Sequence, residues 1–416
     1  MFFKDIRVFD GERAHPRSSV LVRDEQVAAV GTGLTAPPGA AVITGGGRTL
    51  LPGLIDSHTH AASAGSLEQA IVFGVTTELD MFSDPAVYAQ QRGRAADHND
   101  IADLRSAGTG ATVPGGHPTQ FVDLGLFPPF PTISGPAQAD SWVRDRVAEG
   151  SDYIKIFATP PPTEPGMPHL DDDTVRALIA AAHAHGKLAL AHAITRAAAM
   201  AAVDGGLDCL VHLFLDAPGD ADVVDAIAAH GTAVIPTLTI LDAANGQRET
   251  ALERDGRVAP YLTARSVDDL AHPLGEGKTH LGTPAYARDL VRPLADAGVT
   301  LLAGTDAGSP GTAHGASLHQ ELENLVRAGL RPEEALHAAT AAPARLFSLT
   351  DRGRIAPGLS ADLLMVDGDP TADITATRAI AGVWRRGATV DRWRPEDHAG
   401  AARVRVPPAP QQGARD

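Results

Sequence analysis

Residues 53–60 of the chain read GLIDSHTH, a short apolar run that ends in two histidines. A run of this length, entered through a glycine, is typical of a buried β-strand. Side chains alternate between the two faces of a strand, so His58 and His60, two positions apart, point to the same side. The stretch therefore predicts a core strand that presents two imidazoles together at its carboxyl end.

Similar apolar runs recur between Ala-rich stretches of helical period, from about Leu51 to Phe347. Counting these runs gives eight strands, most of them followed by a helix. Strands that alternate with helices favour parallel βαβ units, and eight such units favour a closed (β/α)₈ TIM barrel. A doubly wound sheet is the alternative, but no Gly-rich phosphate fingerprint follows the first strand.

The two ends of the chain have strand character without a helical period. Residues 1–52 include SSVLVRDEQVAAVG, and residues 348–400 include ADLLMVDGDP and AIAGVWRRGATV. We expect these ends to pair into one small β-sandwich beside a barrel of residues 53–347. Residues 401–416 have the Pro- and Gln-containing composition of a flexible tail.

Two segments interrupt the alternation of strands and helices. Residues 112–138 are rich in Pro and Gly, and residues 239–298 are too long for a simple connection between the last two barrel strands. Long insertions between barrel elements are often functional lids. The sequence leaves the role of both insertions open, with a lid over the site as the hypothesis for residues 239–298.

The composition excludes several classes of function. The 35 Lys and Arg residues against 51 Asp and Glu residues give a formal net charge of −16, which argues against binding to nucleic acid or to an anionic membrane. The single cysteine, Cys209, cannot form an intramolecular disulfide and reads as a buried hydrophobe. The N-terminal stretch MFFKDIRVFDGER lacks the apolar core of a signal peptide, so the expected location is the cytoplasm.

Metal-ligand side chains also end other predicted strands. His192 ends KLALAH, His212 lies in CLVHL, and Asp306 ends TLLAGTD. Active sites of parallel barrels gather at the carboxyl ends of the strands, so these residues should meet His58 and His60. A lone histidine at a strand end is commonly a satisfied core residue, but four histidines and an aspartate at corresponding ends predict a metal centre.

Lys155 is the most unusual residue of the predicted barrel. It lies in the middle of the apolar strand YIKIF, with no acidic neighbour in sequence. Lysine is rarely buried without a partner, and desolvation lowers its pKa. A neutral amine can add carbon dioxide to form a carbamate, whose oxygens could bridge two cations. The alternative is a lysine that reaches out to the barrel mouth.

Over nearly its whole length the chain resembles the amidohydrolase superfamily, closest to its prolidase-like and imidazolonepropionase-related branch. The motifs that carry the resemblance are LPGLIDSHTH, GVTTELD, PGGHPTQ, YIKIFAT, LALAH, LDCLVHL, GTAVIPTL, LLAGTDAG, EALHAATAAPARLF and GRIAPGLSADLLMVDGDP. The resemblance implies a TIM barrel with a binuclear metal site held by His58, His60, Lys155, His192, His212 and Asp306.

The same resemblance implies a division of labour among these ligands. His58 and His60 would bind the more buried metal, His192 and His212 the second, and carboxylated Lys155 would bridge the two. Asp306 would bind the first metal and act as the catalytic base. Histidine and carboxylate ligands favour two Zn²⁺ ions, with Mn²⁺ and Co²⁺ as alternatives.

The expected reaction is hydrolysis of an amide bond in a small molecule such as an N-acyl amino acid or a dipeptide-like compound. A water that bridges two cations has its pKa lowered from about 15.7 toward about 7, and Asp306 would carry its proton to the leaving nitrogen. Lactone, ester or phosphotriester hydrolysis on the same centre is an alternative, as is a mononuclear imidazolone-type cyclic amide hydrolase. A non-catalytic barrel is the competing class, and a homo-oligomer is compatible with the resemblance.

Substrate contacts are less constrained than the metal ligands. His117, in the loop GGHP, and His314, in SPGTAHG after Asp306, are candidates for substrate binding, each against an ordinary structural role. Close relatives carry a second histidine where this chain has Ile194, so substrate recognition departs from theirs. Phe121, Phe127 and Phe130, in the insertion 112–138, could form an apolar substrate wall or anchor the insertion to the barrel.

Overall fold

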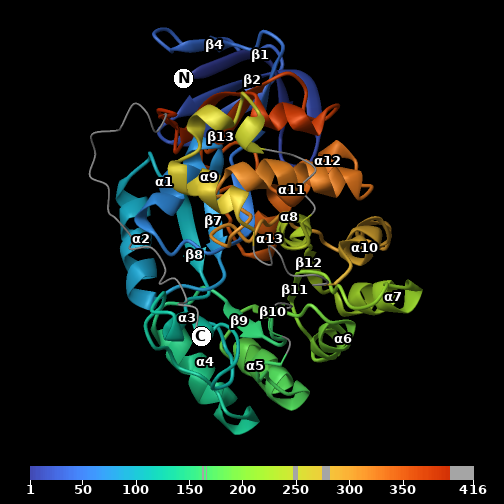
Figure 1. Ribbon diagram of the computed structural model, residues 1–416. Helices are drawn as coiled ribbons and strands as arrows, with labels where there is room; N and C mark the ends of the chain where they lie inside the picture. Colours follow the sequence, from blue (N-terminus) through green and yellow to red (C-terminus); the bar gives the residue numbers. More distant parts are fainter. Residues whose placement is uncertain (162–163, 165, 247–251, 274–281, 394–416) are drawn as a thin grey trace, which may run out of the picture.

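The computed structural model describes residues 1–161, 164, 166–246, 252–273 and 282–393 (Figure 1). Within these ranges the chain forms a mainly antiparallel sheet from its two ends and a larger body of parallel strands and helices between them. The sheet occupies the top of Figure 1, where blue N-terminal and red C-terminal strands lie side by side.

The sheet of the described residues has eight strands, in the order β15-β14-β13-β5-β1-β2-β3, with β4 paired to β1. The antiparallel pairing of β13 with β5, from Leu363 opposite Pro52 to Asp367 opposite Arg48, joins the two chain ends. The bounds of its strands are β1 (Phe2–Phe9), β2 (Ala14–Arg23), β3 (Gln26–Gly31), β4 (Val42–Thr44), β5 (Arg48–Pro52), β13 (Leu363–Asp367), β14 (Ile380–Arg385) and β15 (Ala388–Thr389).

The body between the chain ends contains parallel strands in two described sheets, β6-β7-β8 and β9-β10-β11-β12. Isolated parallel bridges join Ala111 to Ile156, Val234 to Leu301 and Thr59 to Ala307, so residues 301–307 pair at one end with β12 and at the other with β6. The strand bounds are β6 (Leu54–Thr59), β7 (Val75–Asp80), β8 (Asp103–Ser106), β9 (Ile154–Phe157), β10 (Ala189–His192), β11 (Cys209–Val211) and β12 (Ala233–Ile235).

Helices follow most of these parallel strands, as their sequence signals require. In α5, for example, the Asp171 side chain accepts a hydrogen bond from the Thr174 amide, and apolar residues recur three and four positions apart to face the strands. The helix bounds are α1 (Ala64–Val72), α2 (Pro85–Asp97), α3 (Gln120–Asp123), α4 (Ala139–Ala148), α5 (Asp172–Ala184), α6 (Arg196–Asp204), α7 (Ala221–His230), α8 (Leu238–Ala244), α9 (Ala264–Ala271), α10 (Pro284–Asp296), α11 (Ala316–Arg327), α12 (Pro332–Ala338) and α13 (Ala341–Leu346).

The alternation of side chains along β9 shows how the strands divide the core. Ile154 and Ile156 belong to the large apolar cluster that includes helix residues such as Leu178. Lys155 and Phe157 point to the other side of the strand, as does Tyr153, which packs with Leu190. On this inner side, Tyr153 packs among apolar side chains before the start of β9, and Lys155 and Phe157 follow it toward the carboxyl end of the strand.

Residues 252–270 of the insertion 239–298 pack against α1 and the start of α11, whereas α8 and α10 of the same segment contribute to the main core of the body. Leu252, Val258, Leu262 and Leu270 form an apolar cluster with Val72, Phe73, Ala313 and Ala316. The carbonyl of Asp269 accepts a hydrogen bond from the Gly311 amide at 2.7 Å. The insertion is thus fixed to α1 and to the loop that follows Asp306, while the lid hypothesis also concerns residues 247–251 and 274–281, outside the described residues.

The buried His319, on α11, should make the stability of the fold depend on pH. It is 1% exposed, its Nε2–H donates to the carbonyl of Phe73 at 2.9 Å, and burial lowers its pKa to about 3. In the unfolded chain this histidine binds a proton near pH 6.5, whereas in the folded chain it stays neutral. The free energy of unfolding therefore decreases as the pH falls below about 6.5.

We expect the free energy of unfolding of His319→Gln, which cannot titrate but can donate to Phe73, to fall less between pH 7 and pH 5 than that of the wild type. The difference should be roughly 2 kcal/mol. Urea unfolding at both pH values measures it, and parallel pH dependences for the two proteins would contradict the assignment.

None of the helices in the described ranges is both long enough and apolar enough to cross a membrane.

Candidate metal centre

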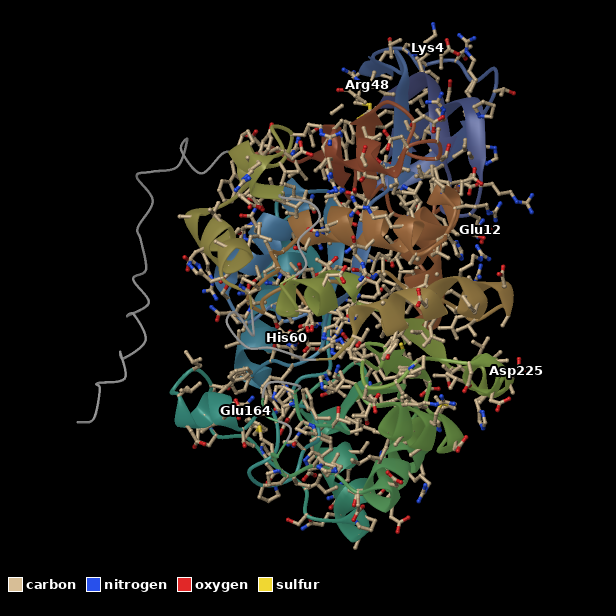
Figure 2. The ribbon with its side chains drawn as sticks, turned by 45° about the vertical axis from the view of Figure 1, so that its right-hand side comes forward. Lys4, Glu12, Arg48, His60, Glu164 and Asp225 are labelled. Carbon is tan, nitrogen blue, oxygen red and sulfur yellow. The ribbon has the colours of Figure 1, made fainter. Side chains whose placement is uncertain are left out.

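The residues predicted as metal ligands lie at the carboxyl ends of parallel segments. His58 is in β6 and His60 follows it, Lys155 is in β9, and His192 ends β10. His212 directly follows β11, and Asp306 lies near the end of the segment 301–307, which bridges β12 and β6. Figure 2 shows His60 in the middle of the molecule, between the upper and the lower groups of helices.

Three of these residues form a compact group. The ligand atoms of His58, His212 and Asp306 all lie within 4.8 Å of one another. Asp306 Oδ1 is 3.6 Å from His58 Nε2 and 3.0 Å from His60 Nε2. One carboxylate oxygen surrounded by imidazole nitrogens is an arrangement that suits a divalent cation such as zinc.

His192 and Lys155 adjoin this group. The ring centroid of His192 lies 4.7 Å from that of His212. Lys155 is 1% exposed, and within the described residues its amine has no hydrogen bond or ion pair with a carboxylate. Burial lowers the pKa of Lys155 to about 7, and the negative charge of Asp306 opposes part of that effect. The amine is thus close enough to Asp306 to sense its charge but lacks the usual carboxylate partner of a buried lysine.

The histidines have the protonation state and the free lone pairs that metal binding needs. Burial, followed by nearby positive charge, holds the pKa of His58 and His192 well below its usual range, and burial lowers the pKa of His212 to about 3. Buried nitrogens without a hydrogen-bond partner in the described chain include His58 Nδ1 and His192 Nε2. Since unpartnered buried nitrogens are costly, neutral imidazoles here fit the role of ligands.

The ring of His212 is oriented by Thr237, which lies between β12 and α8. The Thr237 hydroxyl donates to the carbonyl of Pro236 at 2.8 Å, so its oxygen accepts from His212 Nδ1–H at 2.7 Å. This bond leaves the Nε2 lone pair of His212 free to bind a cation. Both residues have left-handed backbones, with φ of 67° at His212 and 50° at Thr237, a strain that proteins commonly retain at functional sites.

Asp56 locks the two ligand-bearing segments together. Its carboxylate accepts hydrogen bonds from the Thr305 hydroxyl at 2.6 Å, the Thr305 amide at 3.1 Å and the His58 amide at 3.2 Å. These bonds tie β6 to the residue before Asp306. Sequence reasoning missed this contact, although an acidic residue directly after the apolar start of a buried strand was an available signal.

Asp306 is held in a defined orientation. Its φ is 61°, its carbonyl accepts from the Thr312 hydroxyl at 2.9 Å, and its Oδ1 accepts from the Ser309 hydroxyl at 3.0 Å. Burial would raise its pKa, but the neighbouring His58 and His60 hold the pKa of this carboxyl well below its usual range. The side chain is therefore ionised, as a ligand and a base must be.

His117, a predicted substrate contact, lies at the edge of the centre. Its ring centroid is 5.7 Å from that of His192, and burial, followed by the neighbouring His60, lowers its pKa to about 4. Because Gln120 Nε2 donates to His117 Nδ1 at 2.8 Å, the remaining ring nitrogen carries the proton. A neutral imidazole with a free N–H next to the ligands is suited to donate to a substrate oxygen.

His314, the second substrate-contact candidate, is engaged by a buried carboxylate. Its Nδ1 lies 2.8 and 3.1 Å from the two carboxylate oxygens of Glu78 on β7. Burial would lower the pKa of His314, but the charge of Glu78 raises it above its usual value. This pair fixes the loop after Asp306 to β7. Sequence reasoning missed the contact because Glu78 and His314 lie 236 positions apart.

The orientation of His212 can be tested with Thr237→Val, which removes the hydroxyl and keeps the β-branched shape. We expect zinc affinity to fall by about 10- to 100-fold, because the histidine loses the bond that fixes its tautomer. Competition with a chelator measures the affinity. The matched control is Thr232→Val, a buried threonine whose hydroxyl donates to the carbonyl of Leu207. Equal zinc affinities for the two variants would contradict the role of Thr237.

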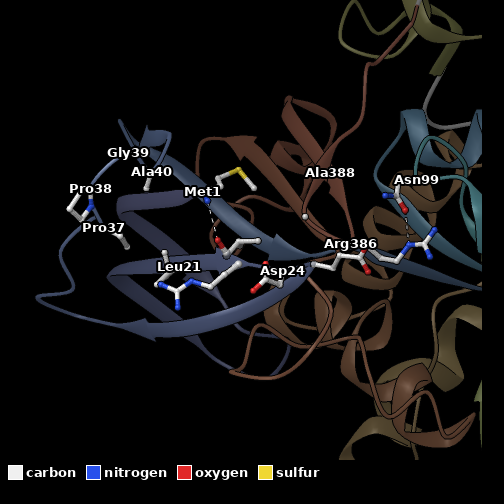
Figure 3. Close-up of a pocket in the computed structure, with 14 residues that line it drawn as sticks. Met1, Leu21, Asp24, Pro37, Pro38, Gly39, Ala40, Asn99, Arg386 and Ala388 are labelled. Carbon is white, nitrogen blue, oxygen red and sulfur yellow. Dashed lines mark hydrogen bonds between the residues drawn. The ribbon is translucent and has the colours of Figure 1, made fainter.

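A separate hollow of about 630 Å³ lies in the eight-stranded sheet, far from the ligands (Figure 3). It is lined by residues of β2, of the loop at 37–40 and of the turn after β14. Arg386 Nε donates to Asn99 Oδ1 there at 2.6 Å, which ties the sheet to the end of α2. None of the predicted ligands lines this hollow.

Comparison with known proteins identifies the family. Residues 49–390 match the family described as the amidohydrolase family. An imidazolonepropionase of Deinococcus deserti is 29% identical over 390 residues, which cover 90% of this chain and 92% of that protein. An uncharacterized protein of Mycobacterium tuberculosis is 30% identical over 355 residues, 81% of this chain and 84% of that protein.

A solved Xaa-Pro dipeptidase, with methionine bound in its active site, has a similar structure. It gives a TM-score of 0.76 at 22% identity and covers 94% of this chain and 99% of its own. The family match and this likeness of fold imply a TIM barrel with an additional domain. They also confirm the resemblance inferred from the sequence motifs. The chain therefore belongs to the amidohydrolase family and is a hydrolase that acts on carbon–nitrogen bonds.

Proposed function

We propose that the protein is a binuclear metal-dependent hydrolase that cleaves an amide bond of a small molecule, such as an N-acyl amino acid or a dipeptide-like compound. The observation that carries the proposal is Lys155, which is buried beside the predicted histidine ligands and has no carboxylate partner among the described residues. A carboxylated lysine at this place would supply the negative charge that two adjacent cations need. The names of the imidazolonepropionase and Xaa-Pro dipeptidase relatives support an amide substrate.

The same proposal extends to the architecture. Residues 301–307 would act as the eighth strand and close the barrel, since they bridge both β12 and β6. The barrel would span residues 53–347, and residues 1–52 and 348–400 would form the second domain. The pairing of β13 with β5 supports that division.

Divalent cations, most simply zinc, would be held by His58, His60, carboxylated Lys155, His192, His212 and Asp306, and when bound would activate water and polarise the scissile carbonyl. The role of Asp306 follows from its position: one oxygen is held by Ser309 and His60, and the other is available to take a proton and deliver it to the leaving nitrogen. The N–H of His117 would orient a substrate oxygen.

Elemental analysis of protein prepared with zinc and bicarbonate tests this proposal, together with release of amino acid from a panel of N-acyl amino acids. We expect about two metals per chain and turnover that chelation abolishes and zinc restores. One metal per chain, with hydrolysis of a cyclic imidazolone and not of the panel, would overturn the binuclear proposal. That outcome would favour the mononuclear alternative to which the Deinococcus deserti relative points.

A further inference from the structure

An aromatic wall begins beside the metal ligands and continues into the insertion 112–138; we define it as Phe82, Phe127, Phe130 and Phe157. Phe157 ends β9, two positions after Lys155. Its ring centroid lies 5.2 Å from that of His117 and 5.9 Å from that of His192. The inner end of the wall therefore touches both a predicted ligand and the predicted substrate contact.

The remaining rings extend the wall away from the ligands. Phe82, which follows β7, has its ring centroid 5.8 Å from that of Phe157, 4.6 Å from that of Phe127 and 5.1 Å from that of Phe130. Phe127 and Phe130 are 5.9 Å apart. Three of these four contacts are edge-to-face, with interplanar angles of 75° to 89°, an arrangement that aromatic rings prefer.

The position of Phe157 depends on a glycine. A Cβ at Gly110 would come within 2.5 Å of the Phe157 ring and 3.3 Å of Lys155 Cγ. Any larger residue at position 110 would collide with the ring and force it to shift. The chain thus leaves room for an aromatic ring next to the reaction centre.

The exposed fractions of the rings distinguish two roles for the wall: an anchor that only holds the insertion 112–138 in place, and a surface that binds substrate. Phe82 and Phe157 are 5% and 4% exposed, whereas Phe127 and Phe130 are only half-buried. An anchor alone would favour full burial of all four rings, because each buried ring contributes through the area it removes from water. Ile194, two positions after His192, adds a further buried apolar side chain just beyond β10.

We propose that the substrate carries an aromatic or similarly bulky apolar group on one side of the scissile bond, and that this group packs on the aromatic wall. This inference rests on the proposed amide hydrolysis and specifies its substrate class. The half-buried rings of Phe127 and Phe130 would become fully buried when the substrate binds, which adds apolar contact.

Turnover of two matched substrate pairs tests the inference: N-phenylacetylglycine with N-acetylglycine, and N-acetylphenylalanine with N-acetylalanine. We expect the phenyl member of at least one pair to have a kcat/KM about 30-fold higher or more. Phe130→Ala should reduce that preference roughly 10-fold through KM, while Phe130→Leu, which retains apolar volume, should reduce it less. The control is Leu126→Ala in the same insertion, where the leucine is 67% exposed.

A binding measurement separates this inference from the proposed reaction. Calorimetry of zinc-loaded protein compares phenylacetate with acetate, and phenylalanine with alanine. Tighter binding of a phenyl ligand that Phe130→Ala weakens would support the wall even if none of the four amides is hydrolysed, in which case the proposed reaction alone fails. Equal kcat/KM within both substrate pairs, or phenyl ligands that bind no tighter than their small partners, would overturn the inference.

Discussion

Lys155→Met protein prepared with zinc and bicarbonate is expected to contain one metal per chain or fewer, where the wild type contains about two, and to lose at least about 10³-fold in kcat/KM for amide hydrolysis. Methionine nearly matches lysine in length and is apolar, so it fills the buried position without a cavity. It cannot add carbon dioxide. The loss would therefore measure the carbamate rather than the packing of β9.

The control for Lys155→Met is the same substitution at a lysine outside the metal centre. Lys187 is half-buried and lies before β10, at the opposite end of that strand from His192, so Lys187→Met should keep both metals and full activity. Preparation of the wild type without carbon dioxide should lower its metal content and leave that of Lys155→Met unchanged. Two metals per chain in Lys155→Met would refute the bridging role.

Asp306→Asn is expected to lower kcat for an amide by at least about 10³-fold while it lowers hydrolysis of an activated ester far less. An amine leaves only with a proton, which asparagine cannot carry, whereas a nitrophenolate leaves without one. The ratio of amide to ester hydrolysis therefore isolates proton transfer from the contribution of Asp306 to metal binding.

Metal content must be measured on the same preparations of Asp306→Asn. Asp289→Asn, which changes an exposed aspartate on α10, serves as the control for both substrates. Equal losses of amide and ester hydrolysis would show that Asp306 acts through metal binding alone and would remove it as the proton carrier.

The sequence was sufficient for the features that repeat along the chain. Apolar runs with helices between them predicted the parallel strands, and the histidines at the strand ends predicted which side chains would meet, because parallel strands share one carboxyl edge. The pairing of the last parallel segment was harder to predict. Residues 301–307 pair with their two neighbours only through isolated bridges. A run of apolar residues in the sequence does not show whether the segment forms a continuous ladder of hydrogen bonds.

The groups that hold the ligands in place could not be predicted. Thr237 orients His212 from the loop between β12 and α8, and Thr305 binds Asp56 from a position 249 residues later in the chain. Threonine is common in strands, so its presence in the sequence does not indicate that its hydroxyl orients a ligand side chain. The left-handed backbones at His212 and Asp306 likewise depend on tertiary contacts, since neither residue is a glycine.

The pairing of β5 with β13 has a consequence for synthesis on the ribosome. β5 ends at Pro52 and its partner begins at Leu363, so roughly 300 residues are made before that edge of β5 can be covered. At about 5 to 20 residues per second, the nascent chain would expose an unpaired strand edge for roughly 15 to 60 s. The body between the two chain ends has time to form first. Synthesis of β13, rather than folding of the body between the chain ends, would then determine when this strand edge stops being a site for aggregation.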